Sequence, residues 1–290
     1  NNTLIGGLAG DAITTGSYNN AFGHASLSTA TTGEQNAAFG RYSLNLNTTG
    51  SENTALGNHA LNSNTTADNN TAVGYYSLYA NTTGASNVSV GKGALSSNTT
   101  ANYNTAVGME ALRENTTGAS NSAYGLYSLL TNTTGGSNVA VGQSALYANT
   151  TASNNTAVGQ SALGANTTGT DNVALGNLAL DANTTASSNT AIGSESLTGN
   201  TTGTLNVGVG ARALRSNTTA NHNTAIGYKT LDVNTTGASN TALGSEALDA
   251  NTTASNNTAV GSAALTANTT GVSNVGVGAN ALQANTTATA

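Results

Sequence analysis

The chain has 290 residues, of which only 6% are charged, and its formal net charge is −6. Globular domains carry about 25% charged residues, so an ordinary globular domain is not expected, and six Lys and Arg residues are too few for a basic nucleic-acid surface. No run of about 18 apolar residues predicts a membrane-spanning helix, and no basic segment ahead of an apolar one predicts a signal peptide.

A glycine recurs every 17 residues from Gly6 to Gly278 and closes a segment of the form Asn-Thr-Ala-Val-Gly. The leading Asn defines position 1 of each copy. A strict repeat without insertions is typical of a solenoid, in which each copy stacks on the last. We therefore predict an all-β fold, one continuous parallel β-solenoid of seventeen 17-residue coils over residues 1–290. The copies within 1–35 are degenerate, with Gly10 in place of the Leu that later copies have at position 9.

Each copy is expected to form one narrow coil of two or three short strands joined by turns. In the copy that begins at Asn138, alternation predicts a strand over 138–142, and a second strand is expected near positions 8 to 10, here 145–147. The large apolar residues at positions 4 and 9 are expected to fill the coil. The Ala and Gly at positions 3 and 5 are expected to let another chain approach closely, the alternative being that this small face lines the coil.

The eighteen charged residues fall only at positions 6, 7, 10, 11, 16 and 17. Disorder would not impose this restriction, so these positions are predicted to face solvent and the others to form core, turn or interface. Acids such as Asp232 and Glu246 are expected to be ordinary surface. Nine of the ten Tyr also occupy these positions, and they are expected to be scattered rather than stacked.

Position 15 carries a second period, because it alternates between Gly and Ala from Gly135 to Ala288. Position 2 is Val only in copies that follow a copy with Gly at position 15. In copies that follow a copy with Ala at position 15, position 2 is always Thr. The sequence therefore indicates a duplicated unit of 34 residues, but it does not indicate whether the fold alternates too.

The segments NVAVGQSAL at 138–146 and NTAIGSESL at 189–197 resemble the head repeats of trimeric autotransporter adhesins, of the YadA-like or Hep/Hag type. Similar units occur in phage tail-fibre-like proteins. The resemblance covers essentially the whole chain, although the family repeat is a few residues shorter. It implies a left-handed parallel β-roll and a homotrimer, with three chains around one axis at the bacterial surface.

Asn-Thr-Thr triplets are the sharpest chemical feature, with fifteen copies of the N-glycosylation acceptor pattern. They predict either a glycosylated stripe or a ladder of stacked Asn side chains. The ladder is favoured, because sugars on strands about 4.8 Å apart would crowd one another. Stacked Thr residues also raise an ice-binding hypothesis. The acceptor asparagines are Asn47, Asn64, Asn81, Asn98, Asn115, Asn132, Asn149, Asn166, Asn183, Asn200, Asn217, Asn234, Asn251, Asn268 and Asn285.

No catalytic residue, metal site or cofactor is predicted, because His24, His59 and His222 lie in distant copies without a consistent partner. The sequence predicts a structural or adhesive extracellular fibre, not an enzyme: a surface adhesin head or stalk, or a filament subunit. A phage tail-fibre shaft and an ice- or glycan-binding solenoid are the alternatives. The expected partners are other copies of the chain, and a host surface or glycans, but not nucleic acid. Because no capping copy is visible, we expect an excerpt of a longer fibrous protein.

Overall fold

The computed structural model describes residues 1–289 and is all β, with seventeen three-residue strands and no helix among these residues. Each 17-residue copy forms one coil that contains one strand, so the predicted parallel β-solenoid is confirmed. The chain divides into two compact units, Asn1–Ser144 and Ala145–Ala290.

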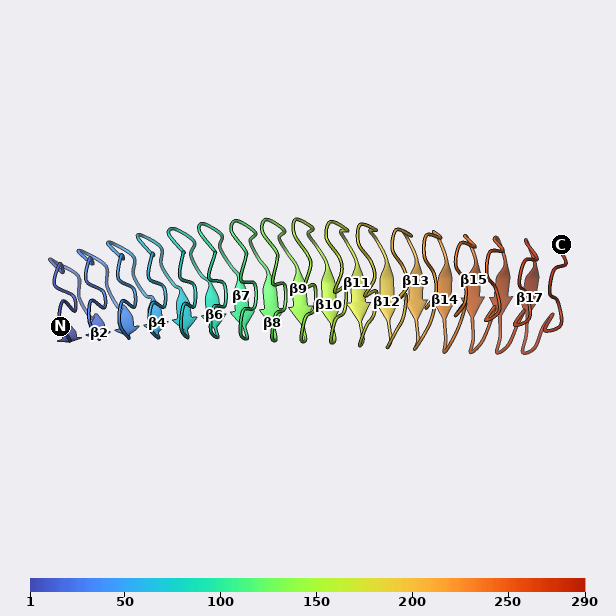
Figure 1. Cartoon of the computed structure of the whole chain (residues 1–290), viewed down its shortest axis with the longest axis horizontal. Coiled ribbons are helices and arrows are strands. Elements are labelled where there is room, and N and C mark those ends of the chain that lie inside the picture. The colour runs from blue at the N-terminus through green and yellow to red at the C-terminus, as the bar shows by residue number, and fades with distance from the viewer. Residues whose placement is uncertain (290) are drawn as a thin grey trace. The chain divides into compact units, whose positions relative to one another are not determined.

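The first unit contains nine strands, each of which pairs in parallel with the next at an offset of 17 residues, as Val107 does with Tyr124. The strands therefore stack in register, one per coil, with a longer loop completing each coil (Figure 1). They are β1 (Thr3–Ile5), β2 (Asn20–Phe22), β3 (Ala37–Phe39), β4 (Thr54–Leu56), β5 (Thr71–Val73), β6 (Val88–Val90), β7 (Thr105–Val107), β8 (Ser122–Tyr124) and β9 (Val139–Val141).

The second unit repeats this arrangement with eight strands, in which Val158 pairs with Leu175 and Leu175 with Ile192. The constant register follows from the repeat, because a coil of fixed length returns the chain to the same place. The strands are β10 (Thr156–Val158), β11 (Val173–Leu175), β12 (Thr190–Ile192), β13 (Val207–Val209), β14 (Thr224–Ile226), β15 (Thr241–Leu243), β16 (Thr258–Val260) and β17 (Val275–Val277).

The two faces of each strand differ in burial, as alternation predicts. In β10 the Ala157 side chain is fully buried inside the coil, whereas Thr156 and Val158 face outward and Val158 is 38% exposed. The expectation that position 4 fills the coil is therefore wrong. The expectation that the Ala face packs against another chain is wrong as well, because the coil is so narrow that its interior accepts only small residues from the strand, such as Ala157, Ser89 and Gly208.

The second strand expected at positions 8 to 10 is absent, because these residues form a turn. The backbone at Leu163 has a φ of +52°, in the left-handed region. Positions 7 and 17 of the same coil, Ser161 and Asp171, also have positive φ. Residues with a left-handed backbone turn the chain back toward the start of its coil. An extended segment at these positions would instead lead the chain away from the coil. The turn directs Leu163 inward, where it is fully buried, so position 9 fills the coil as predicted.

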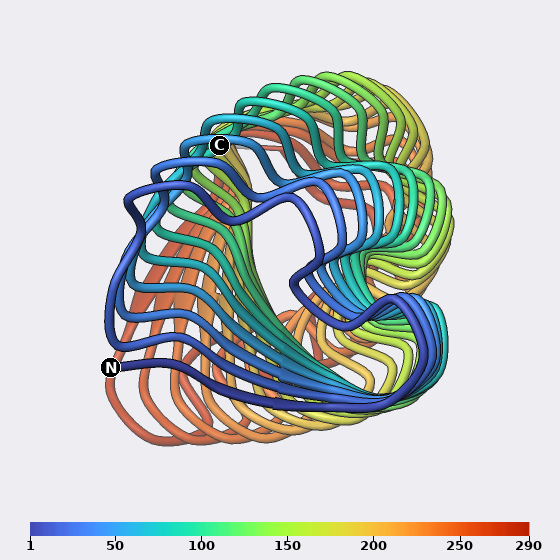
Figure 2. The same cartoon turned by 90° about the vertical axis from the view of Figure 1, so that its left-hand side faces the viewer.

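Viewed along the stack, successive coils of the first unit repeat one outline (blue to green in Figure 2). The outline repeats because every coil uses the same turns at the same positions. The residues that differ between coils therefore lie on a constant scaffold. Any site that distinguishes one coil from another must be built from these residues.

Candidate functional site

The asparagines of the triplets lie inside the coils as a ladder of side-chain amides. Nδ2 of Asn200 donates to the backbone oxygen of Gly203 at 2.9 Å and to Oδ1 of Asn183, one coil earlier, at 3.1 Å. Oδ1 of Asn200 in turn accepts from Nδ2 of Asn217 at 2.9 Å. The side chains from Asn47 to Asn268 are fully buried, and only Asn285, in the last coil, is half-buried.

This geometry matches the ladder alternative, because the acceptor nitrogen is already engaged in two hydrogen bonds. In the folded chain the Nδ2 atom of Asn200 does not face solvent. Attachment of a sugar there would require the coil to open.

A second Asn ladder, which was not predicted from the sequence, runs through position 1. The backbone N–H of Asn206 donates to Oδ1 of Asn189 at 3.0 Å, and Nδ2 of Asn189 donates to the backbone oxygen of Gly203 at 2.9 Å. The oxygen of Gly203 therefore accepts from both ladders, which tie the turn at position 15 to the rest of its coil. The signal that could have found this ladder is the Asn present at position 1 of every copy.

The two Thr residues of each triplet have different environments. The first is half-buried, and its hydroxyl donates to the backbone oxygen of the first Thr in the next coil, as Thr201 does to Thr218 at 3.1 Å. The second, Thr202 in this coil, is exposed in all fifteen triplets, and the Thr202 hydroxyl forms no hydrogen bond within residues 1–289. Only the second Thr of each triplet is therefore exposed, so the triplets form one solvent-facing row of Thr hydroxyls and not two.

The fold alternates with the 34-residue period of the sequence. In a coil with Gly at position 15, the N–H groups of Thr167 and Thr168 both donate to the oxygen of Thr184, at 2.8 and 3.2 Å. In the following coil, which has Ala, Thr184 alone donates to Thr201, at 3.3 Å. The Gly is needed because a Cβ at Gly169 would collide with the next coil's carbonyl.

Position 16 completes the alternation. Where position 15 is Gly, the N–H of Thr170 donates to the hydroxyl of Ser187 in the next coil at 3.0 Å, and the N–H of Thr204 donates to Oδ1 of Asn221 at 2.6 Å. Every coil with Ala at position 15 supplies a short polar side chain at position 16, so the structural unit is a pair of coils. These side chains are Asp68, Asn102, Ser153, Ser187, Asn221, Ser255 and Thr289.

Replacing Asn221 with Ala is expected to lower the free energy of unfolding by about 1 kcal/mol, because the N–H of Thr204 loses its acceptor. Hydrogen exchange should then be faster at the Thr204 amide and unchanged at the Thr170 amide, which bonds to Ser187. Unchanged protection at Thr204 would contradict the pairing of coils described above.

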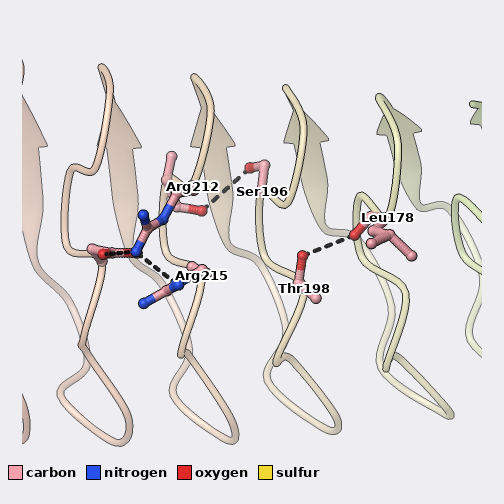
Figure 3. Close-up of polar contacts among 7 residues, drawn as sticks. Leu178, Ser196, Thr198, Arg212 and Arg215 are labelled. Atoms are coloured by element: carbon pink, nitrogen blue, oxygen red, sulfur yellow. Dashed lines mark hydrogen bonds and ion pairs between the residues drawn. The ribbon is translucent and has the colours of Figure 1, made fainter.

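The turn that follows each strand carries most of the variation between coils, at positions 6, 7 and 10. Position 10 lies beside position 7 of the preceding coil, since the hydroxyl of Thr198 donates to the backbone oxygen of Leu178 at 2.8 Å (Figure 3). Position 8 points inward, where the hydroxyl of Ser196 donates to Gly208 at 2.9 Å. We call the surface formed by positions 6, 7 and 10 the turn face.

In the second unit the turn face holds a buried carboxylate between two guanidinium groups. Asp232 is only 4% exposed, with Oδ2 3.0 Å from Nη2 of Arg212 and Oδ1 2.9 Å from Nε of Arg215. Both Arg side chains come from the preceding coil and reach toward this acid (Figure 3). The expectation that Asp232 is ordinary surface is therefore wrong, and the group is an ion-pair clasp between neighbouring coils.

Two other acids at position 10 lack such partners. Burial raises the pKa of Asp181. Burial, followed by the neighbouring Asp232 charge, raises the pKa of Asp249. A raised pKa favours the protonated form in the folded state, so these carboxylates oppose folding once they are ionised.

The Asp181→Asn variant is expected to be more stable than the natural chain at about pH 7 and equally stable at about pH 3. The folded-state pKa of Asp181 lies above its unfolded value. Its contribution to stability is therefore fully present below the unfolded pKa and is lost as the pH rises through the folded pKa. Urea denaturation at both pH values checks this, with Asp171→Asn, at the exposed position 17, as the control. A lower stability of Asp181→Asn at neutral pH would contradict the expectation.

In the first unit one part of the turn face, from His24 to Tyr79, is aromatic. The rings of Tyr42 and His59 are 5.2 Å apart, those of His59 and Tyr76 are 5.0 Å apart, and those of Tyr76 and Tyr79 are 4.6 Å apart. The prediction that the Tyr residues are scattered is therefore wrong for this part of the chain. Position 7 side chains of successive coils stack, which brings together residues that lie 17 apart in the sequence.

The three His residues do not form a shared site. His24 and His59 both belong to the aromatic group, where the ring of His24 packs edge-on against Tyr42 at 5.6 Å, while His222 lies apart on an exposed position 17. Burial and the Arg41 charge lower the pKa of His59. No cluster of three His, Cys, Asp or Glu side chains that could hold a metal ion occurs among the described residues.

Within residues 1–289 the structure contains no helix with the length and apolar character needed to cross a membrane. Comparison of the chain with protein-family models gives no match, and comparison with curated proteins gives none either.

Proposed function

We propose that the chain is a structural element of an extracellular, surface-exposed fibre, an adhesin head or stalk or a filament subunit, which associates with other copies of itself. The observation that carries this proposal is the row of large apolar side chains at position 4, one on the outer face of every strand. Val158, Ile192 and Ile226, for example, are each 37–38% exposed.

The register of the strands aligns these side chains. Val158 lies beside Leu175 and Leu175 beside Ile192, so position 4 forms a continuous apolar column within each unit. Val173 and Val207 at position 2 widen the column in alternate coils. Large exposed apolar surfaces on soluble proteins commonly mark sites of association. Covering this column would contribute about 25 cal/mol for each Å² of apolar surface removed from water.

A second copy of the chain is the simplest partner for the column, because it presents the same surface with the same spacing. Most homo-oligomers have closed symmetry, in which identical surfaces meet around an axis. The resemblance to YadA-like head repeats favours three copies, a left-handed roll and a location at the bacterial surface. The interior Asn ladders support the fibrous role, because each added coil brings the same set of bonds.

The native mass of the purified protein tests the proposal, and a particle three times the mass of one chain is expected. The triple variant Val158→Lys, Ile192→Lys, Ile226→Lys should be monomeric, because it places three ammonium groups in the column. The matched control Gln160→Lys, Ser194→Lys, Tyr228→Lys puts the same charges at position 6 of the same coils and should remain trimeric. Association through this column would be contradicted if the natural chain were monomeric. It would also be contradicted if the two triple variants had the same number of chains per particle.

A further inference from the structure

Six aromatic residues on the turn face of the first unit form one continuous group, which does not include Tyr127 of the same face. We call them the aromatic patch: His24, Tyr42, His59, Tyr75, Tyr76 and Tyr79. Besides the contacts given above, the rings of Tyr75 and Tyr76 are 4.4 Å apart and those of His59 and Tyr79 are 6.2 Å apart. The patch extends over four successive coils, so it is elongated along the stack.

The coil does not require aromatic side chains at these positions. Position 7, which holds Tyr42 and Tyr76, is Ala at Ala25 and Ala263, where the backbone has the same left-handed conformation. Position 6, which holds Tyr75, is Ala at Ala211. Because the same turn forms without them, folding alone does not account for six neighbouring aromatic residues.

The patch is partly open to solvent, with Tyr42, His59, Tyr76 and Tyr79 half-buried and Nδ1 of His59 buried. Tyr75 is 51% exposed and His24 is exposed as well. The hydroxyls of Tyr42, Tyr75, Tyr76 and Tyr79 form no hydrogen bond within residues 1–289. The patch therefore combines apolar ring faces with free hydroxyl groups at their edges.

We infer that the aromatic patch binds a chain of neutral pyranose sugars. A pyranose ring has a C–H face that packs on an aromatic ring and a rim of hydroxyls that exchanges hydrogen bonds with phenol and amide groups. Asn58 is exposed beside the patch and can supply the amide. The elongated row of rings suits several linked sugars better than a single one.

The charges around the patch argue against an anionic ligand. Arg41 lies over the ring of Tyr42, with 4.5 Å between the guanidinium carbon and the ring centroid, and exposed Lys92 occupies position 6 in the coil after Tyr75. The pKa of His59 is lowered, so its imidazole adds no positive charge at neutral pH. One engaged guanidinium and one Lys, three coils apart, do not amount to the cationic cluster that recognises sulfate or phosphate groups.

This inference does not depend on the proposed self-association. The patch lies on the turn after the strand, whereas the apolar column lies on the strand itself. A monomeric variant would present the same rings. A protein that is not trimeric would therefore contradict only the proposed self-association. A trimer that binds no sugar would contradict only the inference about the aromatic patch.

Titration of the full chain with cellohexaose and with chitohexaose tests the inference. The readouts are the ring resonances of the tyrosines and their fluorescence, which no Trp obscures, since the chain has none. Saturable changes with at least one of the two hexasaccharides, with a Kd in the millimolar range or below, are expected. No saturable change with either probe would overturn the inference.

Variants connect the binding to the patch. The double variant Tyr75→Ala, Tyr76→Ala is expected to weaken binding about ten-fold or more. Tyr228→Ala is the matched control, because Tyr228 also occupies position 6 and is 48% exposed but belongs to the second unit. Ala already occupies both positions in other coils, so the double variant is expected to fold, and circular dichroism checks this. Equal loss in the control, or no loss in the double variant, would overturn the inference.

Discussion

Replacement of Asn200 with Asp is expected to cost the second unit about 4 kcal/mol of unfolding free energy at neutral pH. The Asn200 Nδ2 atom donates to Gly203 at 2.9 Å and to Asn183 at 3.1 Å, and a carboxylate would place an oxygen against both acceptors. The side chain is fully buried, so the new charge would have neither water nor a cation beside it. Equilibrium unfolding in urea measures the loss.

Two further variants separate the ladder from the general effect of a substitution. Asn200→Ala removes the same hydrogen bonds without adding charge, and about 2 kcal/mol of destabilisation is expected. Thr202→Ala, two residues away, removes an exposed hydroxyl that forms no hydrogen bond within the described residues, and a change within about 0.5 kcal/mol is expected. Equal stability of Asn200→Asp and Thr202→Ala would show that the ladder does not stabilise the coil.

Gly91→Ala is expected to destabilise the first unit by about 3 kcal/mol or more. Gly91 has a φ of +137°, a region that side chains rarely adopt, and a Cβ there would lie 2.7 Å from the carbonyl carbon of Gly108 and closer still to its oxygen. The next coil's backbone occupies the space that the methyl group needs. Thermal and urea unfolding of the variant measure the effect.

Gly93→Ala, two residues further on, provides a matched control. Gly93 has a φ of +65°, and a Cβ there would meet nothing nearer than Cγ of Glu110 at 3.5 Å. Ala263 already adopts this conformation at the equivalent position, with a φ of +52°. A cost of about 1 kcal/mol is expected from the left-handed conformation. If the two variants were equally stable, close stacking at position 5 would not limit the choice of residue.

The period of the repeat predicted the strand order and register, because a constant 17-residue interval permits only stacked equivalent coils. The inward Leu at position 9 was also predicted correctly. The outward direction of the side chains at position 4 was not predicted, because hydrophobicity does not distinguish a coil interior from an outer strand face. The deciding fact is the small size of the inward strand residue, as at Ala157: a strand that contributes only Ala, Ser or Gly to the interior lies close to the opposite wall of a narrow coil.

The turn could not be predicted from residue preferences. Leu163 has a left-handed backbone, which preference assigns to Gly or Asn. Its burial inside the stacked coils and the hydrogen bond from its N–H to the oxygen of Ala179 stabilise that conformation. The ladder at the triplets was foreseen as one of two alternatives, whereas the aromatic patch was missed. His59 lies 17 residues from both Tyr42 and Tyr76, so their contact is visible only once the repeat positions are superimposed.

The pairing of coils constrains how a gene of this kind can change length. Replication slippage within a repetitive sequence removes or adds whole copies, and loss of a copy with Gly at position 15 would place two copies with Ala next to each other. That junction occurs nowhere in this chain, whereas adjacent Gly copies occur, as at Gly118 and Gly135. Length variants that retain the fold should therefore differ by two copies, or lack a single copy of the Ala type.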